Sequence, residues 1–208
     1  MISSTSICNL ALSHFVGGGK ITSLDDATNT ARILKTNYEN CLQTVLRSFP
    51  WTFARTIDTL DLVTKTYPNY DYVYKYPTNC MRISRVCVEG DLEEPNYQNE
   101  YKELSDGEIQ YIASNIENAY IEYTLYVTNP TMYDSQFVKA LSYLIASEVS
   151  NVLTGNSSLA KEMYQKFQLA IGEAYKSSAN EANLPVIRES RYINARNGTI
   201  PINGRWGR

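Results

Sequence analysis

The chain has few of the residues from which metal sites and disulfide frameworks are built. It contains one histidine, His14, and four cysteines among 208 residues, and no two cysteines form a C-x-x-C pair. A structural zinc site needs closely spaced thiolate and imidazole ligands, and a disulfide scaffold needs a denser set of cysteines. The sequence favours neither, and we expect reduced cysteines that pack as small apolar side chains (Cys8, Cys41, Cys80 and Cys87).

Long hydrophobic runs and an excess of basic residues are also missing. No run of about 18 apolar residues occurs, so the sequence predicts no membrane-spanning helix. The N-terminus lacks the basic region of a signal peptide. Acidic residues outnumber Lys and Arg by 22 to 19, whereas a dedicated duplex-DNA binder normally has a basic footprint. We therefore expect a soluble protein, made in a reducing cytoplasm, that does not bind membranes.

Motifs that carry catalysis are scarce as well. His14 lies beside Phe15 on the apolar face of a predicted helix, where a core or edge histidine is commoner than a catalytic one. The run 17–19 before Lys20 resembles part of a phosphate loop. It lacks the required glycine spacing and the following Ser or Thr, and it follows a helix instead of a strand. We interpret it as an ordinary loop, and the sequence predicts no enzyme, no cofactor and no metal.

Tyrosine, by contrast, is abundant: the chain has 17 Tyr against 5 Phe and 2 Trp. In YPNYDYVYKYP four tyrosines fall on every second position, so on a strand they share one face; they are Tyr70, Tyr72, Tyr74 and Tyr76. We favour packing in a sheet core or an interface, because tyrosine gives a large contact area with a polar tip. Stacking of glycans or nucleobases stays open, although only Lys75 supplies a basic residue within the row.

Helical periodicity marks the first 50 residues. A first helix capped by Ser3 or Ser4 ends at the glycine run. Ser23 and Asp26 have capping-box spacing in front of a second helix of about 25 residues that ends before Pro50. The expected buried faces are Ile7, Leu10, Ala11, His14 and Phe15 in the first helix, and Leu24, Ala27, Ala31, Leu34, Tyr38, Cys41, Leu42, Val45 and Phe49 in the second.

The periodicity then changes to two, and five strands are expected: 57–64, 70–76, 81–88, 109–113 and 119–127. Residues 90–108, between the third and fourth strands, hold seven acids and one lysine, which predicts a solvated loop or the tip of a hairpin. Two further helices follow Pro130, the first ending at Gly155. Residues 185–208 carry five arginines against a single Glu189, and such a tail is flexible unless a partner orders it.

Taken together, these patterns predict an α+β protein. An antiparallel helical bundle of about four helices is expected from residues 1–54 and 130–184. A small β-sheet or sandwich domain, residues 55–129, is inserted into it, and residues 185–208 form an extended C-terminal arm.

Four motifs, in order, resemble one known family. ICNLALSHFVGGGKITSLDD and ATNTARILKTNYENCLQTVLRSFPWTFAR are similar to the start of the head-to-tail adaptor proteins of short-tailed bacteriophages, the tail tubular protein A family. Its members have a Gly-rich turn into I-x-S-L and a long helix with A-x-x-x-A that ends at W-x-F-A. YKYPTNCMRISRV and FVKALSYLIASEVSNVLTG resemble its tyrosine-rich strand and its third helix. The similarity covers about residues 5–180.

This resemblance implies a structural protein of the virion neck without catalytic activity. The family forms a ring, here expected to be a dodecameric homo-oligomer, that joins the portal protein to the tail nozzle protein. Double-stranded DNA passes through its channel without sequence-specific binding. The alternative, from the tyrosines alone, is a binding module that attaches to glycans or a host surface.

Expected site residues follow from both lines of reasoning. Subunit, portal or nozzle contacts are predicted for Tyr70, Tyr72, Tyr74, Tyr76, Arg188, Arg191, Arg196 and Trp206. A channel lining that bound the phosphate groups of DNA would slow its passage, so acidic residues are suited to the lining of the channel. Glu93, Glu94 and Glu103, in the most acidic part of the chain, are therefore expected to face it. A solvated outer loop explains their charge equally well.

Overall fold

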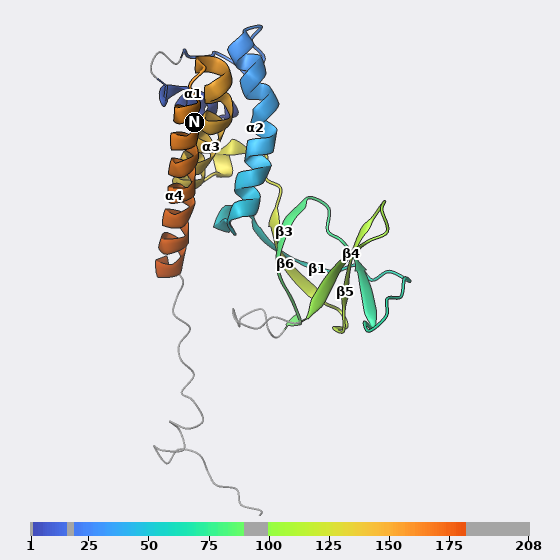
Figure 1. The fold of residues 1–208 in the computed structure, drawn as a ribbon. Helices are drawn as coiled ribbons and strands as arrows, with labels where there is room; N and C mark the ends of the chain where they lie inside the picture. Colours follow the sequence, from blue (N-terminus) through green and yellow to red (C-terminus); the bar gives the residue numbers. More distant parts are fainter. Residues whose placement is uncertain (1, 16–18, 90–99, 182–208) are drawn as a thin grey trace, which may run out of the picture. The chain divides into compact units, whose positions relative to one another are not determined.

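The computed structural model of the protein describes residues 2–15, 19–89 and 100–181, with side chains described as far as Ser177. These residues form a mixed α+β structure with four α-helices and two three-stranded antiparallel sheets (Figure 1). Two units are distinguished, residues 1–174 and 175–208, and the described part of the second is the end of the last helix, 175–181.

The helices are α1 (Ser4–Ser13), α2 (Asn29–Ser48), α3 (Ser135–Thr154) and α4 (Ser157–Glu181), and the strands are β1 (Arg55–Thr59), β2 (Tyr72–Lys75), β3 (Cys80–Cys87), β4 (Tyr101–Ser105), β5 (Gln110–Ser114) and β6 (Tyr120–Leu125). Short 3₁₀ turns, η1 (Thr52–Ala54) and η3 (Pro130–Met132), connect the helices to the strands. The α+β class expected from the sequence is confirmed. In the described part of the chain, α1 and α2 precede all the strands, and α3 and α4 follow them.

Capping residues set the ends of the helices. The Ser3 side chain accepts a hydrogen bond from the Ser6 backbone in a capping box, which confirms Ser3 as the cap of α1. Gly155 ends α3 in the left-handed conformation, with φ of 69°, which is the geometry that glycine adopts at little cost. Asn156 then accepts from the backbone N–H groups of Ser158 and Leu159 and starts α4.

The predicted start of the second helix is wrong. The cap of α2 is Thr28, whose hydroxyl accepts from Ala31 N–H, and Leu24 and Ala27 lie before the helix. The Asp26 carboxylate instead accepts from the backbone N–H groups of Thr22 and Ser23. The capping-box spacing therefore closes a separate turn ahead of the helix.

One hydrophobic core contains buried side chains from all four helices. Examples are Leu12 of α1, Leu42 of α2, Ile145 of α3 and Phe167 of α4, with Trp51 after α2 at 1% exposure. The Trp51 indole N–H donates to Val45 O at 2.8 Å. In α1 the expected face was partly wrong: Leu10 is exposed, and Cys8 and Leu12 are buried.

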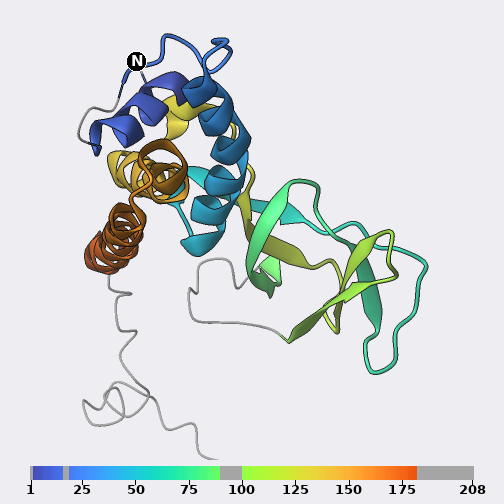
Figure 2. The same cartoon turned by 45° about the horizontal axis from the view of Figure 1, so that its top comes forward.

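Helix α3 is the central element of this core, as Figure 2 shows from a second side. It contacts both α1 and α2, and buried residues occur all around its circumference. Three of its buried residues are serines, and each donates its hydroxyl back to the chain: Ser142 to Lys139 O, Ser147 to Leu144 O and Ser150 to Ser147 O. The polar hydroxyls are thus satisfied inside the core.

The strands form sheets with the orders β1-β6-β3 and β2-β5-β4. Both sheets contribute to a second core, which includes Tyr74 and Ile112 from one sheet and Val86, Ile121 and Tyr123 from the other. Five of the six strands lie within or beside the expected ranges. Strand β4 was missed, because it lies in the acidic 90–108 segment that was predicted as a solvated loop or a hairpin tip. It pairs with β5 from Tyr101 to Ser105, so the end of that segment is one arm of a hairpin and its turn.

Candidate interaction surface and pocket of the strand region

The tyrosine row is divided between core and surface. Tyr74 is 1% exposed, and its hydroxyl donates to Ile116 O. Its ring lies 6.4 Å from that of Tyr72, which packs against the same core together with Tyr76. Tyr74 therefore packs in the sheet core, because a side chain this buried cannot contact a partner.

Tyr70 belongs to a different, more exposed group. Its ring lies 6.2 Å from Tyr67, and its hydroxyl donates to Glu100 Oε1 at 3.5 Å. The ammonium of Lys102 lies 5.5 Å from the Tyr67 ring centre, and Lys65 lies 4.3 Å from the ring centre of Tyr111. Basic residues are thus placed on tyrosine rings by neighbouring segments, which no local sequence spacing indicates.

Asp106 holds this region together at the turn between β4 and β5. Its carboxylate accepts from the backbone of Ile109 and Glu108, from Lys65 Nζ at 2.9 Å and from the Tyr111 hydroxyl at 2.9 Å. The Ile109 backbone bond, followed by Lys65, lowers the pKa of Asp106 well below its usual value. A pocket of about 230 Å³ lies next to it, lined by Lys65, Thr66, Tyr67, Val73, Leu104, Ser105 and Tyr111.

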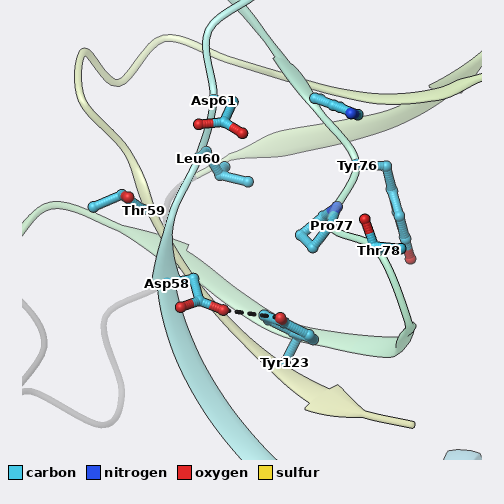
Figure 3. A pocket seen from close by; sticks show the side chains of 9 residues that line it. Asp58, Thr59, Leu60, Asp61, Tyr76, Pro77, Thr78 and Tyr123 are labelled. Carbon is cyan, nitrogen blue, oxygen red and sulfur yellow. Dashed lines mark hydrogen bonds between the residues drawn. The ribbon is translucent and has the colours of Figure 1, made fainter.

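A second and larger pocket, of about 330 Å³, is shown in Figure 3. Its lining residues are Asp58, Thr59, Leu60, Asp61, Lys75, Tyr76, Pro77, Thr78 and Tyr123. The segment from Asp58 to Asp61 forms one side, and Tyr76 and Thr78 stand opposite. The buried Tyr123 hydroxyl donates to Asp58 Oδ2 at 2.9 Å, so one carboxylate is held in place. Burial, followed by that hydrogen bond, raises the pKa of Tyr123 to about 12.

Strand β6 carries a buried ion pair. The Glu122 side chain is 3% exposed and receives Arg85 Nε at 2.7 Å on one oxygen. Arg55 Nε, from a side chain that is 55% exposed, bonds to the other oxygen. Glu122 thereby joins β3 and β1 across the middle strand of its sheet. Its two oxygens are satisfied by guanidinium groups, which is the pairing that a buried carboxylate requires.

His14 is a half-buried residue of the helical core. Its Nε2 lies 3.3 Å from Ser142 Oγ, and its ring centre lies 4.7 Å from that of Tyr143. Burial, followed by the charge of Lys166, lowers the pKa of His14. Packing and a serine contact account for this histidine, as expected from its place on the apolar helix face.

Several predicted site residues lie outside the described part of the chain: Glu93, Glu94, Arg188, Arg191, Arg196 and Trp206. Glu103 is exposed on β4, so the charge that was expected in a loop is carried by a strand. Among the described residues no group of three His, Cys, Asp or Glu side chains could hold a metal ion. None of the helices within them is long and apolar enough to cross a membrane.

A scan of known protein families and a search of curated proteins found no match to this chain.

Proposed function

We propose that the protein is a head-to-tail adaptor of a short-tailed bacteriophage, a structural component of the virion neck and not an enzyme. The proposal starts from the ordered motifs that resemble the tail tubular protein A family. In it, residues 1–54 and 130–184 form an antiparallel helical bundle that builds a ring of twelve subunits. Residues 55–129 form the inserted β domain, which meets the tail nozzle protein.

The observation that carries the proposal is the core shared by helices from both ends of the chain. Leu12 and Leu42 precede all described strands in the sequence, and Ile145 and Phe167 follow them, yet the four side chains belong to one hydrophobic core. An inserted strand region agrees with the order of the motifs that carry the resemblance, in which the tyrosine-rich strand lies between helical segments. Two cores in one chain suit an adaptor that must contact a portal with one part and a nozzle with another.

The strand region supplies a surface suited to protein contacts. Tyr70 with Tyr67, and Tyr72 and Tyr76 at the margin of the second core, retain the mixed apolar and polar character that interfaces favour. Tyr74 is excluded from this role by its burial. The burial of the Tyr74 ring also makes it less favourable for the four tyrosines of the row to act as one continuous surface on which glycans stack.

Two parts of the proposal rest on sequence alone. The arginine-rich segment 185–208 would reach a neighbouring subunit or the portal, with Arg188, Arg191 and Arg196 as anchors and Trp206 as a plug, since arginine makes bidentate contacts and stacks on aromatic rings. Glu93, Glu94 and Glu103 would face the DNA channel. A ring in which Glu103 lies on the outer rim would contradict this second part.

Binding to portal-bearing capsids tests the function. Purified chain is mixed with capsids of the same phage that contain the portal and lack tails, and with capsids assembled without the portal as a control. We expect co-sedimentation only with portal-bearing capsids, and the chain alone can remain monomeric until the portal templates the ring. Equal recovery with both kinds of capsid, or with neither, contradicts the proposal.

A further inference from the structure

The pocket between Asp58–Asp61 and Tyr76–Thr78 is not required for an adaptor. It is bordered by the end of β1, the segment after it, and the turn that follows β2 (Figure 3). Its volume of about 330 Å³ is at the lower end of the range for small-molecule sites, which is roughly 300–1,000 Å³. It could hold one small ring.

The charges of the lining restrict the class of ligand. The lining residues include Asp58 and Asp61, which carry carboxylates, and Lys75, which carries an ammonium group. An anionic ligand would meet two carboxylates, and a cationic ligand would meet the lysine, so each would include a repulsive contact. A neutral ligand with hydroxyl groups meets neither penalty, because each hydroxyl can both donate and accept.

The remaining lining residues suit the same class. Thr59 and Thr78 add hydroxyls, which can donate or accept as the ligand requires. Tyr76, Pro77 and Leu60 add apolar surface against which the C–H face of a ring can pack. Asp58 is already oriented by the Tyr123 hydroxyl at 2.9 Å, and a fixed acceptor loses less entropy when it binds.

We propose that this pocket binds a single neutral sugar ring, with Asp58 and Asp61 accepting hydrogen bonds from its hydroxyls, Lys75 donating one, and Tyr76 packing on its apolar face. The site is independent of the adaptor proposal. It also differs from the tyrosine row as a glycan platform, because Tyr76 alone of that row lines it. Affinity for a free monosaccharide is expected in the millimolar range, since a small open site buries little surface.

The test is saturation-transfer NMR on the full chain with glucose, galactose, mannose and N-acetylglucosamine, each alone. Arginine amide and methyl phosphate, which both carry the non-exchangeable protons that this method detects, serve as the cationic and anionic probes. We expect at least one monosaccharide to bind and its affinity to fall about tenfold in both Asp61→Asn and Lys75→Gln, because each change replaces a charged hydrogen-bonding group by a neutral one, and hydrogen bonds to charged groups are the stronger. Both residues are exposed, so the fold should tolerate each change.

Asp71→Asn is the matched control, because Asp71 is an exposed aspartate of the same strand region outside the pocket; its affinity should equal that of the unchanged protein. The proposal is overturned if no monosaccharide binds, if only arginine amide or methyl phosphate binds, or if neither pocket variant weakens the binding. None of these outcomes bears on recovery with portal-bearing capsids, so the two proposals fail separately.

Discussion

At the scale of single residues, Glu122 is a charge whose burial is offset by two arginines. Its carboxylate joins Arg85 and Arg55 across the middle strand of one sheet. Taking a carboxylate out of water costs several kcal/mol, and attraction to a well-placed guanidinium offsets that cost. The triad therefore contributes to the registry of the sheet more than to net stability, since an apolar trio of similar shape can be equally stable.

Replacing Glu122 by Gln should destabilise the protein. The substitution keeps the size of the side chain but removes its charge beside Arg85, whose side chain is 7% exposed. We expect the free energy of unfolding in urea to fall by about 3 kcal/mol, within the range for breaking a buried pair. Glu103→Gln, on an exposed residue, is the control and should change it by less than about 0.5 kcal/mol. Equal effects of the two substitutions would contradict this account of Glu122.

The burial of several single residues could be predicted from the sequence, but their partners could not. Periodicity correctly placed Leu34, Leu42 and Val45 inside the helical core. It could not show that Lys65 lies over Tyr111, or that Glu122 meets Arg85. Such pairs come from segments far apart in the chain, and their distance depends on the sheet register, which no local spacing encodes.

At the scale of helices and strands, Gly155 and Gly172 differ in the backbone conformation that they adopt. Gly155 has φ of 69° at the end of α3, whereas Gly172 lies inside α4, and a Cβ at either position would meet no atom within 4 Å. The backbone alone therefore decides the effect of an added methyl group.

We expect Gly155→Ala to lower the free energy of unfolding by about 1 kcal/mol, because a left-handed conformation strains an L-residue. Gly172→Ala should raise it by roughly 0.5–1 kcal/mol through helix propensity. Urea unfolding followed by circular dichroism measures both. The same sign for the two substitutions would show that contacts, and not backbone conformation, control these positions.

The β4–β5 hairpin depends on the ionised form of Asp106. Because the fold lowers the pKa of this carboxyl from its ordinary value of 3.8, the ionised form stabilises the folded state at neutral pH. That contribution is fully present above the pKa of the unfolded chain and is lost as the pH falls through the lower folded pKa.

Asp106→Ala should accordingly be less stable than the unchanged protein at pH 7. The difference should narrow as the pH falls from about 5 to about 2, since protons are then taken up by the unfolded chain first. Urea midpoints of both proteins at several pH values measure it, with Asp71→Ala as the control. A difference that stays constant down to pH 2 would mean that Asp106 acts through packing and not through its charge.

The types of element were easier to predict than their limits. All four helices were expected from apolar periodicity, which extends over many residues. Strand β4 was missed because Lys102 and Glu103 are both exposed, and an edge strand has little apolar alternation to detect. The start of α2 was misplaced because Ser23 and Thr28 are both residue types that cap helices, and only their backbone geometry separates the turn at Ser23 from the helix cap at Thr28.

At the scale of the whole molecule, the proposal gives the segment 185–208 a role in assembly and not in folding. Among the residues that the structure describes, the buried side chains of the helical core extend to Ala174, and the proposal expects the fold to form without that segment. Removing the residues after Leu184 should leave the helical signal in far-ultraviolet circular dichroism unchanged. The midpoint of urea unfolding should also stay the same. It should abolish co-sedimentation with portal-bearing capsids. If the truncated chain still joins capsids and supports tail attachment, the segment is dispensable.

The central claim is that twelve copies of this chain form a ring on the portal. Electron cryomicroscopy of portal-bearing capsids incubated with the full chain tests it most directly. The account predicts one added ring of density below the portal, with twelvefold symmetry, into which the four helices and both sheets of each subunit fit. Capsids that show no added density, or copies of the chain bound elsewhere without a ring, would contradict it.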